Sequence, residues 1–462
     1  MTDNSTIYAL STPAGNGAIA VIRLSGDEAF SIADTLFRAK NSSKKLSAQK
    51  SFTIHFGSLV HKNEIIDEVL VSLFKNPNSY TGEDVVEISC HGSVYIQQRI
   101  MQALSECGAR LATPGEFTMR SFLNGKMDLS QAEAVADLIA SQSAASHKIA
   151  FEQMKGGFSS QLDILRGRLL HFISLIELEL DFSEEDVEFA DRKQFHQLLE
   201  EIDTHISQLV KSFAYGNVVK TGVPVAIAGR TNVGKSTLLN ALLNEEKAIV
   251  SDIAGTTRDV IEDTMTMEGI TFRFIDTAGI RHTTDTIETL GIERTFERIS
   301  KARIVLYVAE ATDSSDDIRK ALEGIPLRDD QHLILVLNKY DLLSDEELKS
   351  KQDNLRQLDV PLVFLSAKKK LHIQTLQKKI ISIVQASKTD NGVVVTNIRH
   401  YESLQQAKQA VDRIFEGLEN RVSTDLIAQD LREVLYHIGE ITGEITTDEV
   451  LGNIFRNFCI GK

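Results

Sequence analysis

The residues GRTNVGKS at 229–236 combine glycines, a lysine and a serine in a spacing that suits phosphate binding. They follow an apolar run and precede the helical pattern STLLNALL, which is the strand–loop–helix context of a P-loop. Glycines let backbone N–H groups face phosphate oxygens, and the start of the next helix adds positive potential. We therefore predict that Lys235 reaches the β- and γ-phosphates and that the Ser236 hydroxyl ligates Mg²⁺.

Three further short motifs follow the P-loop, each after an apolar run of strand length. DTAG at 276–279 offers an aspartate for the Mg²⁺ side of the site and a glycine that can sense the γ-phosphate. NKYD at 338–341 offers a carboxylate that can accept from the N1–H and the 2-amino group of guanine together, donors that adenine does not present. SAK at 366–368 can brace the base. These motifs, in this order, predict a GTP site.

The stretch GTTRD at 255–259 lies between the P-loop and DTAG, at the place of a switch I loop. Thr257 is predicted to supply a second hydroxyl to Mg²⁺, with an ordinary polar turn as the alternative interpretation. The full set of residues predicted to contact GTP is Asn232, Val233, Gly234, Lys235, Ser236, Thr237, Ser251, Asp252, Ile253, Ala254, Gly255, Thr256, Thr257, Asp276, Thr277, Ala278, Gly279, Asn338, Lys339, Asp341, Ser366, Ala367 and Lys368.

The position after DTAG is Ile280. In Ras-like proteins a glutamine at this position orients the attacking water, and an apolar side chain cannot hold a water. Another residue must do so, or hydrolysis is slow. The acidic candidates nearby are Asp285 and Glu288, and Arg281 is the nearest cation.

The elements around these motifs fall into regions of different pattern. Residues 1 to about 120 contain short β-branched-rich runs bounded by turn residues, which predict strands at 18–24, 68–74 and 84–90. From Asp128 the apolar spacing becomes helical, and Ser130 with Glu133 predicts a capping box.

Long amphipathic helices with short links predict a helical bundle. Those helices are predicted after Gly157 and at about 191–213, 398–420, 424–441 and 447–458. Residues 184–193 are predicted to be a solvated link, and residues 387–392 a polar linker.

Between Pro224 and about residue 384 near-continuous apolar runs alternate with helical patterns, which predicts a doubly wound parallel sheet buried on both faces. Helices on both sides favour one helical domain with an inserted α/β domain, and two unrelated helical pieces are the alternative. The predicted fold is therefore multidomain α/β plus α. Its segments are an α+β domain at 1–120, helical parts at 121–218 and 385–462, and the inserted domain at 219–384.

Composition narrows the class of protein. The chain has 462 residues, 42% of them hydrophobic and 25% charged, as expected of a globular protein with two or three domains. We expect a cytoplasmic protein without a signal peptide or membrane span, and its three cysteines fit reduced thiols. The formal net charge of −15 argues against a general nucleic-acid binder but does not exclude a local basic patch.

Stretches along the whole chain resemble the MnmE (TrmE) family of bacterial tRNA-modification GTPases. They are TPAGNGAIAVIRLSG, YTGEDVVEISCHG, PGEFTMRSFLNGKMDLSQAEA, the GTPase motifs and the terminal FCIGK. The resemblance implies GTP hydrolysis coupled to modification at C5 of the wobble uridine of certain tRNAs, giving an aminomethyl- or carboxymethylaminomethyl-type group. It also implies a homodimer formed through the N-terminal domains, G domains that meet when GTP is bound, and a complex with the FAD-containing partner MnmG.

The resemblance further implies two cofactor sites. Potassium would bind Asn232, Ser251, Ile253 and Thr256, and Glu288 matches the catalytic glutamate that positions water. A tetrahydrofolate derivative, 5-formyl or 5,10-methylene, would contact Arg23, Glu87, Lys126 and Lys462. Such contacts are chemically sensible because a pterin offers paired N–H donors to a carboxylate and the folate tail is anionic.

The chain ends with a thiol and a lysine close to an apolar helical pattern. That pattern predicts a docked helix that anchors the tail, and the family places the tail beside the folate with Cys459 as a candidate participant in the chemistry. A small buried hydrophobe is the alternative role for Cys459. Cys90 with His91 is interpreted as a buried cysteine beside an exposed histidine.

Two other functions compete with a tRNA-modifying GTPase. The first is a GTPase switch in ribosome assembly, whose members usually add a basic RNA-binding domain that this acidic chain lacks. The second is a non-hydrolysing GTP-binding scaffold, which Glu288 argues against.

Overall fold

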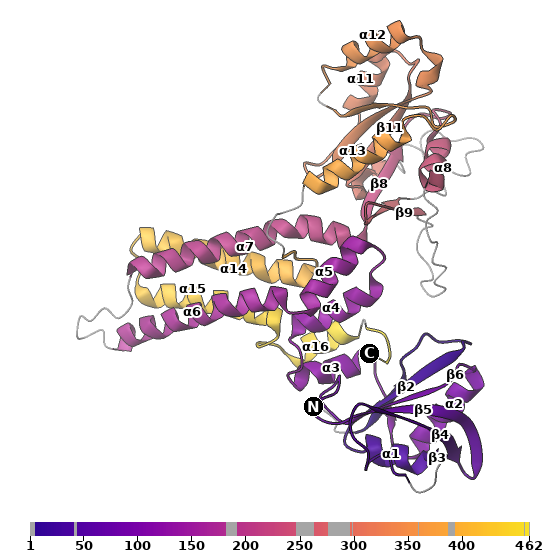
Figure 1. Ribbon diagram of the computed structural model, residues 1–462. Helices are drawn as coiled ribbons and strands as arrows, with labels where there is room; N and C mark the ends of the chain where they lie inside the picture. Colours follow the sequence, from indigo (N-terminus) through magenta and orange to yellow (C-terminus); the bar gives the residue numbers. More distant parts are fainter. Residues whose placement is uncertain are drawn as a thin grey trace. The chain divides into compact units, whose positions relative to one another are not determined.

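The computed structural model describes residues 5–40, 44–181, 192–245, 263–275, 296–297, 299–358, 360–386, 393–456 and 458–461. These residues form two compact units (Figure 1). Unit 1 comprises residues 1–139, 151–198 and 409–462, and unit 2 comprises residues 140–150 and 199–408. The division into units falls inside long helices and does not test the domain boundaries predicted from the sequence. Those boundaries stay predictions.

Unit 1 contains a seven-stranded sheet in the order β3-β4-β5-β6-β2-β1-β7. Neighbouring strands run antiparallel, except that β1 and β7 are parallel. The strands are β1 (Ile7–Leu10), β2 (Ile19–Ser25), β3 (Phe37–Ala39), β4 (Thr53–His61), β5 (Glu64–Phe74), β6 (Val85–His91) and β7 (Arg110–Leu111).

The two faces of this sheet differ. Helices α1 (Ala29–Leu36) and α2 (Val94–Glu106) pack on one face and enclose the main core of the sheet. On the other face, α3 (Glu116–Leu123) packs Phe117 against Ile7 and Ala9 of β1. Large apolar side chains on this second face, along β2, β4 and β5, stay exposed.

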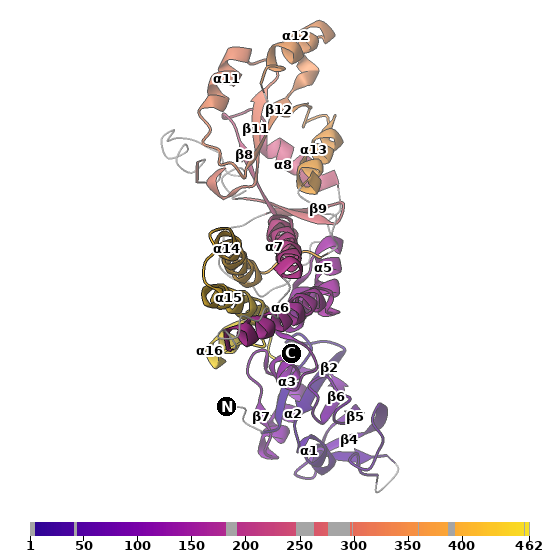
Figure 2. The ribbon, with the colours of Figure 1, turned by 90° about the vertical axis from the view of Figure 1, so that its left-hand side faces the viewer.

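Among the described residues, seven further helices lie outside the two sheets and the helices that cover them (Figure 2). They are α4 (Leu129–Ala140), α5 (Ala144–Met154), α6 (Gly157–Asp181), α7 (Arg192–Thr221), α14 (Ile398–Glu419), α15 (Thr424–Thr442) and α16 (Asp448–Phe455). Within unit 1, α6 and α15 lie side by side.

The predicted capping box at Ser130 and Glu133 is wrong. Asp128 Oδ1 accepts from the Gln131 backbone N–H at 2.9 Å, and the Gln131 side-chain oxygen accepts from the Asp128 backbone N–H at 2.9 Å. The box therefore lies two residues earlier, because an aspartate caps the helix as well as a serine does.

Unit 2 contains a six-stranded sheet in the order β13-β12-β11-β8-β10-β9. The strands are parallel apart from β9, which pairs antiparallel with β10 at the edge of the sheet. The strands are β8 (Val223–Ala228), β9 (Asp263–Met267), β10 (Ile270–Phe274), β11 (Ile304–Glu310), β12 (His332–Asn338) and β13 (Leu362–Phe364).

Helices pack on both faces of this sheet, as a buried parallel sheet requires. They are α8 (Lys235–Glu245), α11 (Ser315–Glu323), α12 (Asp345–Leu355) and α13 (Ile373–Ala386), with a short 3₁₀ turn, η2 (Tyr340–Leu342), after β12. The predicted doubly wound fold is confirmed, with one antiparallel edge strand that the sequence did not predict. No helix in the described part of the chain is long and apolar enough to cross a membrane.

Candidate functional site

The P-loop joins β8 to α8 and depends on two glycines. Gly229 and Gly234 have φ angles of 141° and 96°, which favour glycine. A Cβ at Gly229 would clash with the Val308 carbonyl oxygen, and one at Gly234 would clash with the Asn338 side chain. Asn232 also adopts a left-handed φ of 63° and is exposed. The loop therefore presents its backbone beside the start of α8, as phosphate binding needs.

Asn338 joins three of the predicted motifs. Its side chain is buried, donates to the Val233 carbonyl at 2.8 Å, and accepts from the backbone N–H groups of Lys339 at 2.8 Å and Ala367 at 3.0 Å. The P-loop, NKYD and SAK are thereby fixed to one another at the carboxyl ends of β8, β12 and β13. This is the edge of an open α/β sheet where ligands bind.

Asp341 is the carboxylate predicted to read guanine. Lys369 Nζ lies 2.9 Å from Asp341 Oδ2. Hydrogen bonds from Lys369 and Ser366 lower the pKa of Asp341. The group is therefore a carboxylate at neutral pH, the form that can accept from two guanine donors at once.

The lysines of the site have polar neighbours of their own. Lys235 Nζ donates to the carbonyls of Gly229 at 2.7 Å and Arg230 at 2.6 Å, on the loop that would hold the phosphates. Lys339 has a φ of 61° and pairs with Glu310. Ser236 and Thr237 begin α8, where hydroxyls can reach a cation beside the phosphates.

Many predicted site residues lie outside the described residues. They are Ser251, Asp252, Ile253, Ala254, Gly255, Thr256, Thr257, Asp276, Thr277, Ala278, Gly279, Glu288 and Lys462. Their proposed roles rest on the sequence.

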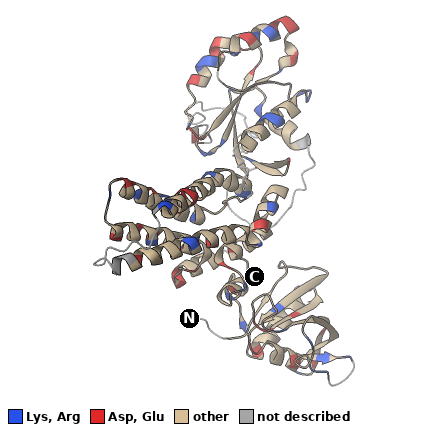
Figure 3. Cartoon of the chain, turned by 60° about the vertical axis from the view of Figure 1, so that its left-hand side comes forward, with Lys and Arg blue, Asp and Glu red and all other residues tan. Residues whose placement is uncertain are grey.

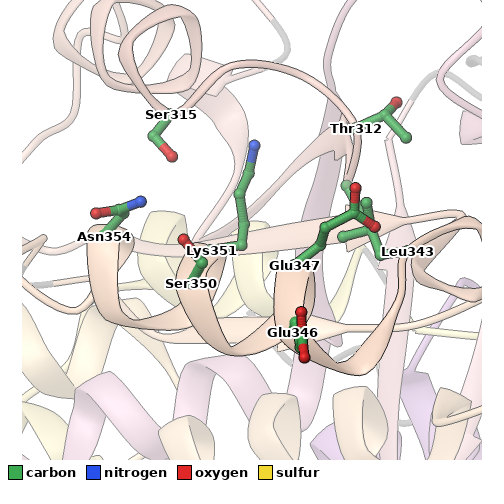
Figure 4. A pocket seen from close by; sticks show the side chains of 9 residues that line it. Thr312, Ser315, Leu343, Glu346, Glu347, Ser350, Lys351 and Asn354 are labelled. Atoms are coloured by element: carbon green, nitrogen blue, oxygen red, sulfur yellow. The ribbon is translucent and has the colours of Figure 1, made fainter.

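A separate pocket of about 490 Å³ lies between α11 and α12 (Figure 4). Thr312 and Ser315 line one side, and Glu347, Lys351 and Asn354 line the other. Lys351 Nζ donates to the Asp313 carbonyl, and burial lowers its pKa. The pocket shares no residue with the predicted GTP contacts, so it is not the nucleotide site.

In unit 1 the predicted folate residues Arg23 and Glu87 are direct cross-strand partners on β2 and β6. Arg23 Nη2 lies 2.8 Å from Glu87 Oε1. The guanidinium also lies 5.4 Å from the centre of the Tyr80 ring and 5.6 Å from that of Phe117. Lys126 is exposed and donates to the Pro77 carbonyl at 3.0 Å. The structure thus brings Arg23 and Glu87 together.

The C-terminal tail is docked within unit 1. Leu451 and Phe455 of α16 are buried, and α16 ends at Phe455, earlier than predicted. The Gly115 N–H donates to the Cys459 carbonyl at 3.4 Å, and the Ser11 hydroxyl donates to the Gly461 carbonyl at 3.2 Å.

Beyond Phe458, the two described side chains of the tail face outward. Cys459 and Ile460 are exposed. The alternative role of Cys459 as a buried hydrophobe is therefore wrong. Because Gly115 starts α3, which carries Phe117, the tail lies at the helix that supports Arg23.

Sequence reasoning missed a buried ionic network at this helix. Glu116 is 4% exposed and accepts from Arg110 at 2.6 Å and Arg120 at 3.0 Å. Arg120 also donates to Glu83 at 3.2 Å. The signal in the sequence was the spacing of Glu116 and Arg120, since side chains four residues apart are neighbours on the surface of a helix.

Hydrogen bonds hold Glu116 ionised. Burial alone would raise its pKa, but bonds from Arg110, the Thr113 backbone and Arg120 outweigh burial and hold the pKa at about 2. A carboxyl group with a folded-state pKa below its unfolded value stabilises the fold above the unfolded value of about 4.3. That contribution is lost as the pH falls toward 2.

Glu116→Gln should therefore lower the free energy of unfolding of unit 1 at pH 7 by about 2 kcal/mol or more, because the buried Arg120 and the half-buried Arg110 lose a charged acceptor. Hydrogen exchange of α3 and β7 in a urea series measures this. Glu64→Gln, which removes an exposed partner of Arg99, is the control and should change stability by less than about 1 kcal/mol. The role given to Glu116 would be contradicted if both variants lost equal stability. It would also be contradicted if the stability lost in Glu116→Gln did not become smaller between pH 4 and 2.

Cys90 and His91 do not form a reactive pair. Cys90 is buried, and burial raises its pKa to about 11. The exposed His91 ring bonds instead to Asp67 at 2.8 Å. The interpretation of a structural cysteine beside an exposed histidine is confirmed.

Comparison with known proteins gives matches along the whole chain. The family model for the TrmE N-terminus matches residues 6–126, and that for the MnmE helical domain matches residues 129–459. The tRNA modification GTPase MnmE of Flavobacterium johnsoniae is 54% identical over 471 residues, covering 100% of both chains. The MnmE of Bacteroides thetaiotaomicron is 55% identical over 465 residues, also covering 100% of both.

Among solved structures, the G domain of the T. maritima FeoB iron transporter is 28% identical, covering 35% of this chain and 97% of that one. Its TM-score of 0.25 is too low to support a structural inference. The two family models and the full-length relatives agree with the joined P-loop, NKYD and SAK motifs. The chain belongs to the MnmE family of tRNA modification GTPases.

Proposed function

We propose that this chain hydrolyses GTP and, together with the FAD-containing partner MnmG, modifies C5 of the wobble uridine of certain tRNAs. The observation that carries the proposal is the full-length identity to tRNA modification GTPases. The geometry supports it in both units: Asn338 joins the nucleotide motifs in unit 2, and the tail docks at α3 in unit 1. No feature of the residues that the structure describes favours the ribosome-assembly alternative.

In the GTPase half of the function, backbone N–H groups of the P-loop and Lys235 would hold the phosphates, and Asp341 would select guanine. Mg²⁺ would bind Ser236 and Thr257, and K⁺ would bind Asn232, Ser251, Ile253 and Thr256. The exposed, left-handed Asn232 supports this because its side chain is not engaged in the core. A monovalent cation at that place would offset negative charge that develops on the phosphates.

Hydrolysis should accordingly depend on potassium. Replacing KCl by NaCl at equal ionic strength should lower kcat by an order of magnitude or more, about 1.4 kcal/mol in barrier, because the smaller ion suits the cage poorly. A phosphate-release assay measures this. Asn232→Ala should remove most of the difference between the two salts. Equal rates of the unmodified chain in KCl and NaCl would exclude a potassium site.

In the modification half of the function, a tetrahydrofolate derivative would supply a one-carbon unit. Arg23 and Glu87 fit such a ligand because a guanidinium that lies near two aromatic rings is paired with a carboxylate. Lys126 and Lys462 would add positive charge for the anionic folate tail. Glu87 would accept from the pterin N–H donors.

The same face of the sheet supports a homodimer. The register places Arg23 and Glu87 on one face with large exposed side chains of neighbouring strands. Those side chains are Ile19 (67% exposed), Ile54 (66%), Phe56 (45%) and Leu70 (47%). Apolar groups gathered on one sheet face are typical of a protein interface. A second copy of this chain is the occupant we propose, in line with the family's N-terminal dimer.

A reconstituted reaction tests the whole function. The chain, MnmG, a tRNA transcript, the folate, GTP and KCl are incubated together, and the digested tRNA is examined by mass spectrometry. We expect an aminomethyl- or carboxymethylaminomethyl-type uridine at position 34 only when every component is present. An unchanged uridine in the complete mixture would contradict the proposal.

A further inference from the structure

A segment of this acidic chain carries lysines and no acidic residue. It runs from residue 366, just after β13, to residue 386 at the end of α13, in a chain with a formal net charge of −15. We define its lysine and histidine side chains as the basic strip. The members are Lys368, Lys369, Lys370, His372, Lys378 and Lys379.

The fold turns the basic strip toward solvent. On α13 the buried positions are Ile373, Leu376, Ile380, Ile381 and Val384, which leaves Lys378 and Lys379 exposed. The turn before the helix exposes the other members, and Lys370 and His372 there have φ angles of 55° and 61°. Figure 3 shows blue positions on α13 and on the turn before it.

Four of the five lysines of the strip are available for a ligand. Lys369 pairs with Asp341. Within the described ranges, Lys368, Lys370, Lys378 and Lys379 have no acidic partner. The His372 ring stacks on Tyr340, with centroids 4.9 Å apart and planes 19° from parallel. His372 is exposed and Tyr340 is half-buried, so lysines beside the His372 ring offer contacts both to phosphates and to an unstacked base.

We propose that the basic strip binds the phosphate backbone of the tRNA substrate. This inference rests on the proposed function, which supplies the RNA. An acidic protein is a poorer match, because protein interfaces have an apolar centre depleted of charge. Within residues 366–386, Leu371 is the large hydrophobic side chain that is exposed, and apart from Ala386 the other exposed residues are polar or charged.

The test is tRNA binding by the full chain, measured by fluorescence anisotropy over a salt series. The double variant Lys378→Glu with Lys379→Glu should weaken tRNA binding about tenfold or more near 0.1 M salt. The reason is that these two side chains would no longer neutralise phosphates and release the counterions bound to them. The slope of log K against log salt should fall by about one to two. RNA-free GTP hydrolysis should not change, since neither lysine is placed at the nucleotide.

The matched control is Lys320→Glu with Lys349→Glu, on the exposed faces of α11 and α12. It alters the net charge equally and should change tRNA affinity less than about threefold. Lys378→Gln with Lys379→Gln, a milder change, should give an intermediate loss. Equal losses in the strip and control variants, or no loss in the strip variants, would overturn the proposal.

Two parallel measurements keep the outcomes distinct. If the unmodified chain supports tRNA modification while the strip variants bind tRNA normally, the basic strip is wrong and the proposed function stands. If the unmodified chain supports no modification, the proposed function itself fails. Binding of poly-aspartate is measured as well. If the strip variants bind poly-aspartate more weakly but bind tRNA normally, the strip serves an acidic protein and the RNA proposal is overturned.

Discussion

Glu288→Ala is expected to lower kcat for GTP hydrolysis by about 100-fold or more while the affinity for GTP stays within about twofold. The reason is the apolar Ile280 at the position where a glutamine would orient the attacking water. Loss of a contact made only in the transition state slows the chemical step without weakening ground-state binding. Single-turnover hydrolysis and binding of a non-hydrolysable analogue measure the two quantities.

Asp285→Ala is the matched control, because Asp285 is the other acidic residue close to Ile280. It should change kcat by only a few-fold. If the nucleotide affinity of Glu288→Ala falls as far as its rate, Glu288 has a structural role. If Asp285→Ala is the slow variant, the water-positioning role belongs to Asp285.

Deletion of Cys459 to Lys462 is expected to abolish tRNA modification and to leave potassium-dependent GTP hydrolysis largely intact. The deleted tail bonds to Gly115 and Ser11 in unit 1, while the nucleotide motifs lie in unit 2. Cys459→Ser should impair modification more than it impairs folding, because the exposed thiol contributes little to packing. Modified uridine formed by the truncated chain in the reconstituted reaction would show that the tail serves only packing.

Two glycine variants separate the position of the tail from its chemistry. Gly461 has a φ of 97°, and a Cβ there would clash with the Leu10 carbonyl oxygen, so Gly461→Ala should undock the tail with the thiol retained. Gly452 on α16 has no atom within 4 Å of an added Cβ, so Gly452→Ala should be harmless. We expect modification to fall in the first variant and to persist in the second. Equal activity of the two would contradict a need for the docked tail.

The nucleotide site was largely predictable from the sequence because phosphate and guanine recognition need particular residues at fixed strand ends. The P-loop, NKYD and SAK motifs are brought together by Asn338 as those motifs imply. The Lys369–Asp341 pair was not predictable, since a turn of uncommon backbone geometry determines where Lys369 points. The edge strand β9, DTMTM, was missed because it is short and is not a continuous apolar run like the buried strands, although its alternation of Thr and Met is typical of a half-buried strand.

The site in unit 1 was less predictable because it depends on contacts between distant segments. Strand register decides that Arg23 faces Glu87, and a single-residue shift would place them on opposite faces. The Glu116 network joins β7, α3 and the loop before β6, and only its Glu116–Arg120 pair has a local sequence signal. Apolar spacing did predict the docked C-terminal helix, but not where it ends.

The most direct test of the central claim is mass spectrometry of wobble nucleosides in total tRNA from cells that lack this protein. Complementation with the unmodified chain should restore the modified uridine at position 34, and Glu288→Ala should not restore it. A wobble-uridine profile that is unchanged by loss of the protein would contradict a GTPase that serves tRNA modification.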